Sequence, residues 1–274
     1  GLSEAFPGSI TVNLVSKDGQ IISSLSKNIS LLPIDESASA DHVDEILASF
    51  VTPNDDAVKE LVNKASSILL SKYKSSSFAA YQFHDPNKVL EELDALYLAL
   101  EGEGIRYSEP PSSFEKSFQR VRLPYVVIKE KLGTCIDLSL LLASMIEAVG
   151  LRPLLVIVNG HALTGAWLDE DSFVDGTELL NEASKGYNHL ALINAVDASS
   201  MSSLNFSQAL ENGYHALEEA KPFYYALDIA SCRHERILPI PTPHKLEDGS
   251  ISLSFPFNKE TKEYETPSVD VSER

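Results

Sequence analysis

A cysteine and a histidine are the two side chains of this sequence whose positions suggest chemistry. Cys135 follows a glycine and a threonine at the start of a long apolar run, and His161 opens a later apolar run. At a helix N-terminus, unpaired backbone N–H groups and the helix dipole favour the thiolate, which is the nucleophilic form of cysteine. A histidine on an adjoining strand can accept and return a proton. The two residues therefore predict nucleophilic catalysis, provided that a third side chain orients the imidazole.

The segment that carries the cysteine has the features of a buried helix. Thr134 and Asp137 have the T-x-x-D spacing of a capping box, and Gly150 is a helix stop. Apolar residues occupy most positions between them, which leaves too few polar positions for a surface helix, so we predict a buried one. The charge of Asp137 opposes thiolate formation unless another group compensates it.

Two strands are predicted after this helix. Residues 154–158 are a short aliphatic run that follows Pro153, and residues 160–168 are a second run that begins with Gly160 and His161. The histidine therefore stands at the head of a strand that follows the cysteine-bearing helix closely in the chain.

These segments resemble the transglutaminase-like superfamily, whose core is shared with papain-type cysteine proteases. The resemblance rests on G-T-C-x-D at the helix start and on G-H-A at the head of the later strand, and it covers residues 112–199. The resemblance is closest to a bacterial branch of this superfamily, which is found in large multidomain proteins with helicase and nuclease modules. That branch has segments similar to SFEKSFQRVRLP, GTCIDLSLL and GHALTGAWL of this chain. The resemblance implies an α+β fold in which the buried helix packs on an antiparallel sheet. It also implies Cys135 as nucleophile, His161 as base and an acidic third residue on the following strand.

Many members of the superfamily have H-A-W where this chain has His161-Ala162-Leu163, so that tryptophan has no counterpart here. Two aspartates compete for the third position. Asp175 lies in SFVDGTELL, which resembles the V-D-P-T ending of the family, whereas Asp197 ends the longer apolar run of residues 190–196. An orienting carboxylate must be held rigidly, and a strand end in the core is the better platform. We therefore predict Asp197 as the third residue, with Asp175 as the alternative. A structural role for Asp197, as the cap of a turn through Ser199, is the other interpretation.

An oxyanion hole needs a donor beside the nucleophile, and the backbone N–H of Cys135 is the predicted donor. Gln119 is a second candidate, with a surface amide as its alternative. The segment 232–236 (CRHER) is predicted to be a polar turn after a strand rather than a second site. We expect no metal and no cofactor, because neither cysteine has a C-x-x-C partner and the histidines lack ligand spacing. Gly102-Glu103-Gly104 is a helix stop, not a phosphate loop.

Composition limits the remaining possibilities. The net charge of −18 argues against direct nucleic-acid binding, because phosphate contacts need clustered Lys and Arg. No apolar run approaches the ~20 residues of a membrane span, and the N-terminus lacks the pattern of a secretion signal. Two cysteines do not make a disulfide framework. We expect a soluble cytoplasmic protein that acts on a protein or peptide substrate. The leading Gly1 suggests a piece of a larger multidomain chain.

We predict three regions: an N-terminal β-rich module over residues 1–35, the transglutaminase-like core over 36–245 and a tail over 246–274. Two or three strands are predicted over residues 9–15 and 20–32, either as a small module of their own or as an edge on the core. Further helices are expected at 42–50, 58–69, 86–100, 124–131 and 206–217, and further strands at 105–107, 190–196, 224–229 and 251–255.

The predicted reaction is attack of the Cys135 thiolate on a carbonyl or carboxamide carbon, with protonation of the leaving amine by His161. Water or an amine then resolves the thioester, and hydrolysis is the default because no protected amine site is visible. The alternative is a module that has kept the fold and lost the reaction, serving as a binding or scaffolding piece. A sulfur walled off by apolar side chains would favour that alternative.

Overall fold

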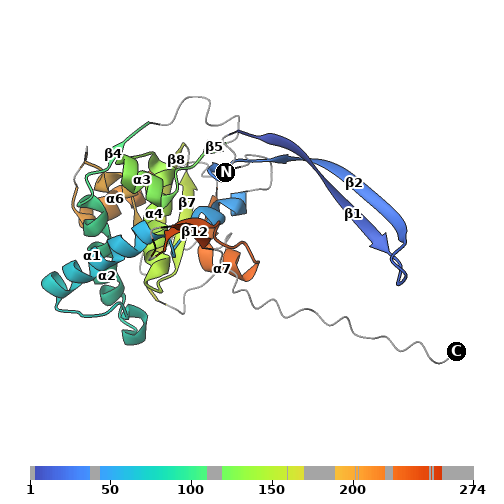
Figure 1. The fold of residues 1–274 in the computed structure, drawn as a ribbon. Helices are drawn as coiled ribbons and strands as arrows, with labels where there is room; N and C mark the ends of the chain where they lie inside the picture. Colours follow the sequence, from blue (N-terminus) through green and yellow to red (C-terminus); the bar gives the residue numbers. More distant parts are fainter. Residues whose placement is uncertain are drawn as a thin grey trace.

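The helix α4 (Cys135–Ala148) lies inside the body of the molecule (Figure 1). The computed structural model describes residues 4–37, 44–109, 119–158, 160–169, 189–200, 202, 204–219, 225–246, 248 and 250–254. The predicted capping box is present, because the Thr134 side chain accepts from the Asp137 N–H and the Asp137 carboxylate accepts from the Thr134 N–H. All residues from Cys135 to Ile146 are buried, which confirms the predicted interior helix. The chain leaves the helix through Gly150, whose φ of +84° favours glycine.

A four-stranded sheet lies beside this helix, with the order β10 (Tyr225–Asp228), β7 (Pro153–Val158), β8 (His161–Trp167), β9 (Leu190–Ile193). Every neighbouring pair is antiparallel, so the predicted α+β class with an antiparallel sheet is confirmed at that level. The predicted strand over 190–196 is too long. Its ladder ends at Ile193 because the Asn194 N–H donates to the Ala209 carbonyl, and residues 195–198 form the short 3₁₀ helix η3.

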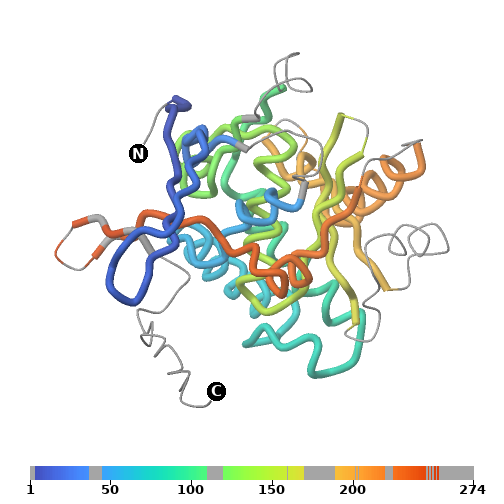
Figure 2. The backbone as a smooth tube through the Cα atoms, turned by 90° about the vertical axis from the view of Figure 1, so that its right-hand side faces the viewer, coloured from blue at the N-terminus to red at the C-terminus, as the bar shows by residue number. Residues whose placement is uncertain are grey.

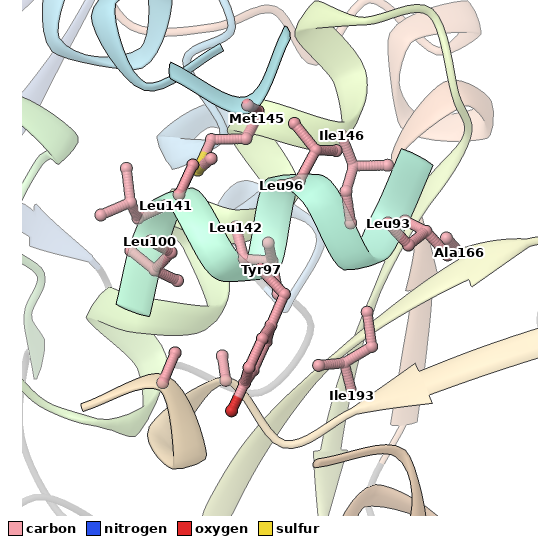
Figure 3. Close-up of a cluster of buried hydrophobic side chains, with 14 of the residues drawn as sticks. Leu93, Leu96, Tyr97, Leu100, Leu141, Leu142, Met145, Ile146, Ala166 and Ile193 are labelled. Carbon is pink, nitrogen blue, oxygen red and sulfur yellow. The ribbon is translucent and has the colours of Figure 1, made fainter. Parts of the chain in front are cut away.

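Helices cover both faces of the sheet. On one face, α4 packs against Ala166 and Ile193 and is itself covered by α1 (Asp56–Tyr73) and α2 (Pro86–Glu101). Figure 3 shows the α2 side chains meeting those of α4 in this core. On the other face, α6 (Phe206–Glu219) packs so closely that a Cβ on Gly213 would lie 2.3 Å from the Leu192 carbonyl oxygen. The predicted helices at 58–69, 86–100 and 206–217 are thereby confirmed.

Short elements complete the body. The predicted helix at 42–50 is the 3₁₀ helix η1 (Asp44–Phe50), and the helix predicted at 124–131 is α3 (Pro124–Glu130). The strand predicted at 105–107 is β4 (Arg106–Tyr107), which pairs in parallel with β6 (Leu132–Gly133). The segment predicted to be a polar turn begins within a short helix, α7 (Ile229–His234), because the Asp228 side chain caps it. The remaining elements are η2 (Ala80–Phe83), β3 (Glu36–Ser37), β5 (Gln119–Arg120), β11 (Thr242–Lys245) and β12 (Ile251–Ser254).

The N-terminal strands β1 (Phe6–Val15) and β2 (Ile21–Leu31) form a hairpin that projects from the body as an arm (Figure 1). Figure 2 views the molecule from the side to which the hairpin points. Among the described strands, β1 and β2 pair only with each other, so the β-rich piece is an arm rather than an edge of the central sheet. Among the described residues, no helix has the length and apolar character needed to cross a membrane.

Candidate active site

Cys135 is the first residue of α4, as predicted, but its side chain lies under a cover of apolar residues. It is 2% exposed and belongs to a cluster with residues of η1, β7, β8 and α7. Burial raises the pKa of the thiol, and the nearby Asp137 charge adds to the rise. The backbone N–H groups at the helix start act in the opposite direction without cancelling this effect. The expectation that the helix terminus favours the thiolate is therefore outweighed by desolvation, which favours the neutral thiol.

The sulfur lies against the peptide bond that joins His161 to Ala162. The Ala162 N–H donates to the sulfur, while the carbonyl of the same residue accepts from the Ser139 hydroxyl at 3.0 Å. Thr164 donates from Oγ1 to the Ser139 carbonyl at 3.0 Å, so α4 and β8 are joined at successive points. Cys135 and Ser139 are four residues apart and share one face of the helix. The fold thus brings the backbone of the predicted base next to the predicted nucleophile.

The imidazole of His161 is held by an asparagine. Its Nε2 lies 2.9 Å from Oδ1 of Asn194, the residue directly after β9. The orientation of this amide follows from its other end, where Asn194 hydrogen-bonds the Asp197 carboxylate. Because an amide oxygen only accepts, Nε2 carries a proton in this contact, and in the neutral ring Nδ1 is the basic nitrogen. That tautomer is the one a general base needs when its second nitrogen is held by an orienting group.

Asp197, the predicted third residue, lies behind this asparagine. It is 5% exposed, and it accepts from Asn212 Nδ2 at 2.9 Å as well as from Asn194. Burial raises the pKa of Asp197, while the hydrogen bonds and the His161 charge act to lower it. Among the described contacts, the side chain bonded to the imidazole is Asn194, and the carboxylate supports that side chain from the far end.

Asn194 was not among the predicted site residues, because a carboxylate was expected at this position. Asn194 directly follows β9, the strand whose end was predicted to carry the orienting residue. The location of the orienting group was therefore predicted, but the side chain that provides it was not. A Cys–His–Asn arrangement is a known variant of the catalytic triad. An amide at a buried strand end, beside a candidate histidine, was therefore a usable signal.

Tyr107 is a second neighbour of the sulfur that the sequence did not indicate. Pairing of β4 with β6 places Tyr107 opposite Gly133, two residues before Cys135. Its hydroxyl donates toward the sulfur, and burial followed by the charge of Cys135 raises the pKa of the phenol. Tyr107 packs against the apolar cluster that contains Cys135 and so forms part of the cover over the sulfur.

The capping aspartate is paired with an arginine, although its charge still adds to the rise in the pKa of Cys135. Arg122 donates its backbone N–H to Asp137 Oδ1 at 2.8 Å and its Nη1 to Oδ2 at 3.1 Å. Oδ2 also accepts from the Thr134 N–H at 2.9 Å. Asp137 is thus a structural residue that fixes the loop before the nucleophile.

Two other candidates are not placed. Asp175 lies outside the described residues, and for Gln119 only the backbone is described, paired with Ser37 in the β3–β5 ladder. Their proposed roles stay predictions. Within the described part of the chain, no group of three or more His, Cys, Asp or Glu side chains has the arrangement of a metal site.

The second cysteine belongs to a structural cluster. Cys232 is a free, buried thiol in α7, and burial raises its pKa to about 11. The neighbouring Arg233 binds Glu147 through two nitrogens, at 2.9 Å each, and donates to the carbonyls of Ala48, Val51 and Ile237. These bonds connect α7 and η1 to the end of α4. They give Arg233, in the polar segment 232–236, a structural role.

Comparison of the chain with protein-family models, with curated proteins and with solved structures finds no match.

Proposed function

We propose that this protein is a cysteine-dependent enzyme of transglutaminase-like, papain-related type that cleaves or transfers acyl groups at amide bonds of a protein or peptide. The observation that carries the proposal is the oriented imidazole of His161, bonded through Nε2 to Asn194, on a strand whose next peptide N–H donates to the Cys135 sulfur. A nucleophile, a base and an orienting group then come from α4, β8 and the end of β9.

In the proposed reaction, Nδ1 of His161 takes the proton of the Cys135 thiol as the sulfur attacks the carbonyl carbon. The backbone N–H of Cys135 stabilises the oxyanion. The tetrahedral intermediate collapses with cleavage of the C–N bond, and His161 returns the proton to the departing amine. Water then attacks the thioester, gives its proton to His161 and releases the acid, while the thiol is restored. An amine in place of water makes the same enzyme a transferase.

The cover over the sulfur has to open before a substrate reaches it. Because the resting thiol is buried, reaction requires movement of a covering side chain, and Tyr107 is the described residue whose hydroxyl already contacts the sulfur. A substrate carbonyl that binds next to the sulfur would displace the Tyr107 hydroxyl from it. The displaced O–H would then lie beside the carbonyl oxygen and donate to the developing oxyanion.

Alkylation of the folded protein tests this proposal. We expect iodoacetamide or an activated acyl ester to modify Cys135 faster than Cys232, as read by mass spectrometry of the separated peptides. The acylated protein should lose its acyl group on standing in water, because His161 activates the hydrolytic step. Equal and slow modification of both thiols would contradict the proposal.

A second candidate function is a non-catalytic module with the same fold, serving as a binding or scaffolding piece of a larger multidomain protein. The burial of Cys135 and the raised pKa of its thiol favour it. In that case Cys135 should react only as fast as the whole protein unfolds, so its labelling rate would follow the unfolding rate as denaturant is added.

A further inference from the structure

The arm formed by β1 and β2 has one apolar face and one polar face. Register pairing places the polar residues Ser9, Thr11 and Asn13 opposite Asn28, Ser26 and Ser24, and cross-strand hydrogen bonds join Thr11 to Ser26 and Asn13 to Ser24. The alternate positions carry Phe6, Ile10, Val12, Leu14, Leu25, Ile29 and Leu31. Gly8, Ser23 and Lys27 share the apolar side, and Val15, Ile21 and Ile22 are exposed in and beyond the bulge at the turn end. Over the paired positions between them, the alternation is that of a sheet that buries one side.

The large side chains on the apolar face of the arm are exposed to solvent. Six of its seven large side chains, all except Ile29, are between 45% and 72% exposed. An isolated two-stranded hairpin is at best marginally stable in water, and a contiguous exposed apolar surface marks an interaction site. The body offers no matching surface among the described residues, because its other exposed large hydrophobics are scattered: Ile34, Ile46, Leu70, Phe83 and Leu246.

We propose that the apolar face of the arm is a self-association surface, on which the arm of a second copy of this chain packs face to face across a two-fold axis. Two-fold symmetry makes each face the complement of the other. Each of the six exposed side chains presents on the order of 100 Å², so two faces bury roughly 1,200 Å², the lower end of specific interfaces. The contact converts two marginal hairpins into one four-stranded sandwich.

Charge places the contact on the arm rather than on the body. Residues 6–31 carry Lys17, Asp18 and Lys27, a net charge of +1, which leaves −19 for the rest of the chain out of a total of −18. Two bodies of like charge repel each other, whereas two arms do not, and the arm extends away from the body (Figure 1). Lys27 is the one charge on the apolar face, opposite Ile10. Because β2 is an edge strand, the long side chain of Lys27 can extend past the edge of the apolar face and keep its ammonium group in water.

Sedimentation velocity of the full chain, from about 1 µM to about 200 µM, tests the proposal. We expect a monomer–dimer equilibrium that added NaCl strengthens, because salt screens the repulsion between the acidic bodies. The double variant Val12→Thr/Leu25→Thr keeps side chains suited to strands on a cross-strand pair and removes the apolar contact. It should weaken dimerisation by at least about tenfold.

The matched control is Asn13→Thr/Ser24→Thr, a cross-strand pair on the opposite, polar face. It should leave the dimer unchanged. The proposal is overturned if the wild-type chain is monomeric over the whole range, if the Val12/Leu25 variant dimerises as well as the wild type, or if both variants weaken the dimer equally. These outcomes are independent of the chemistry of Cys135.

Discussion

Cys135 and Cys232 are buried in the same apolar cluster, yet their polar neighbours differ. The sulfur of Cys135 receives a backbone N–H from the strand that carries an oriented histidine, and a tyrosine hydroxyl faces it. Cys232 lies beside an arginine whose nitrogens are engaged by Glu147 and backbone carbonyls. Burial raises the pKa of both thiols. A buried position therefore does not separate a structural cysteine from a candidate nucleophile, whereas the donors that contact the sulfur do.

Exchange of each cysteine for alanine should give the largest difference. We expect Cys135→Ala to reduce acylation by an activated ester at least about 10³-fold, because it removes the nucleophile. Cys232→Ala should leave the acylation rate nearly unchanged and lower the free energy of unfolding by about 1 kcal/mol. Stopped-flow acylation and urea denaturation measure the two effects. Similar acylation rates for both variants would remove the distinction between the cysteines.

His161→Ala should reduce the acylation rate of Cys135 by about 10²-fold, since a positioned general base typically contributes that much or more. The iodoacetamide labelling of Cys232 serves as the internal control, because the charged groups that shift the pKa of this thiol are Glu45, Asp228, Arg233 and Glu235. A variant that acylates at the wild-type rate would show that the imidazole does not take the thiol proton.

The pH dependence of alkylation distinguishes a neutral thiol from a thiolate–imidazolium pair. Because the pKa of Cys135 is raised, the thiolate fraction grows as pH increases, and the labelling rate should rise about tenfold per pH unit from pH 7 to pH 9. The rate for Cys232 should rise in the same way toward its pKa of about 11. A plateau for Cys135 below pH 7 would mean that its thiolate forms in the resting protein.

Asn194→Ala and Asp197→Asn compare the two residues behind the imidazole. Asn194→Ala removes the contact to Nε2, so we expect the acylation rate to fall by about tenfold, with a change in its pH profile. Asp197→Asn leaves the contact between Nε2 and Asn194 in place and removes the charge behind it, so it should have a smaller effect, about threefold. Asn194→Asp is the conservative control, since its carboxylate can still accept from Nε2. A larger loss in Asp197→Asn than in Asn194→Ala would make the aspartate the orienting residue.

Tyr107→Phe should give the smallest effect. It keeps the ring in the cover and removes the hydroxyl that faces the sulfur, so we expect a change of only a few-fold in the labelling of Cys135. If the hydroxyl also assists the oxyanion, acylation by an ester should decrease while alkylation by iodoacetamide does not. Tyr125→Phe is the matched control, because burial also raises the pKa of that phenol but Cys135 is not among the causes of the shift.

Several features followed from local patterns. The capping residues Thr134 and Asp137 placed Cys135 at the first position of a helix, and the alternation of apolar and turn residues placed His161 at the head of β8. The strand predicted over 190–196 was too long, because the Asn194 N–H donates to the Ala209 carbonyl instead of continuing the sheet. Ala209 lies in α6, which is further along the chain. No pattern near residue 194 indicates that bond.

Sequence alone determined the elements and the order in which they carry the cysteine and the histidine, because caps, turns and side-chain periodicity act within a few residues. Tertiary structure decided which side chain holds the imidazole, how deeply the thiol is buried and which hydroxyl faces it. Those properties depend on Tyr107, Asn194 and Asp197, which reach the site from elements distant in the chain. The pKa of a buried thiol likewise reflects all the groups packed around it, not its own position in a helix.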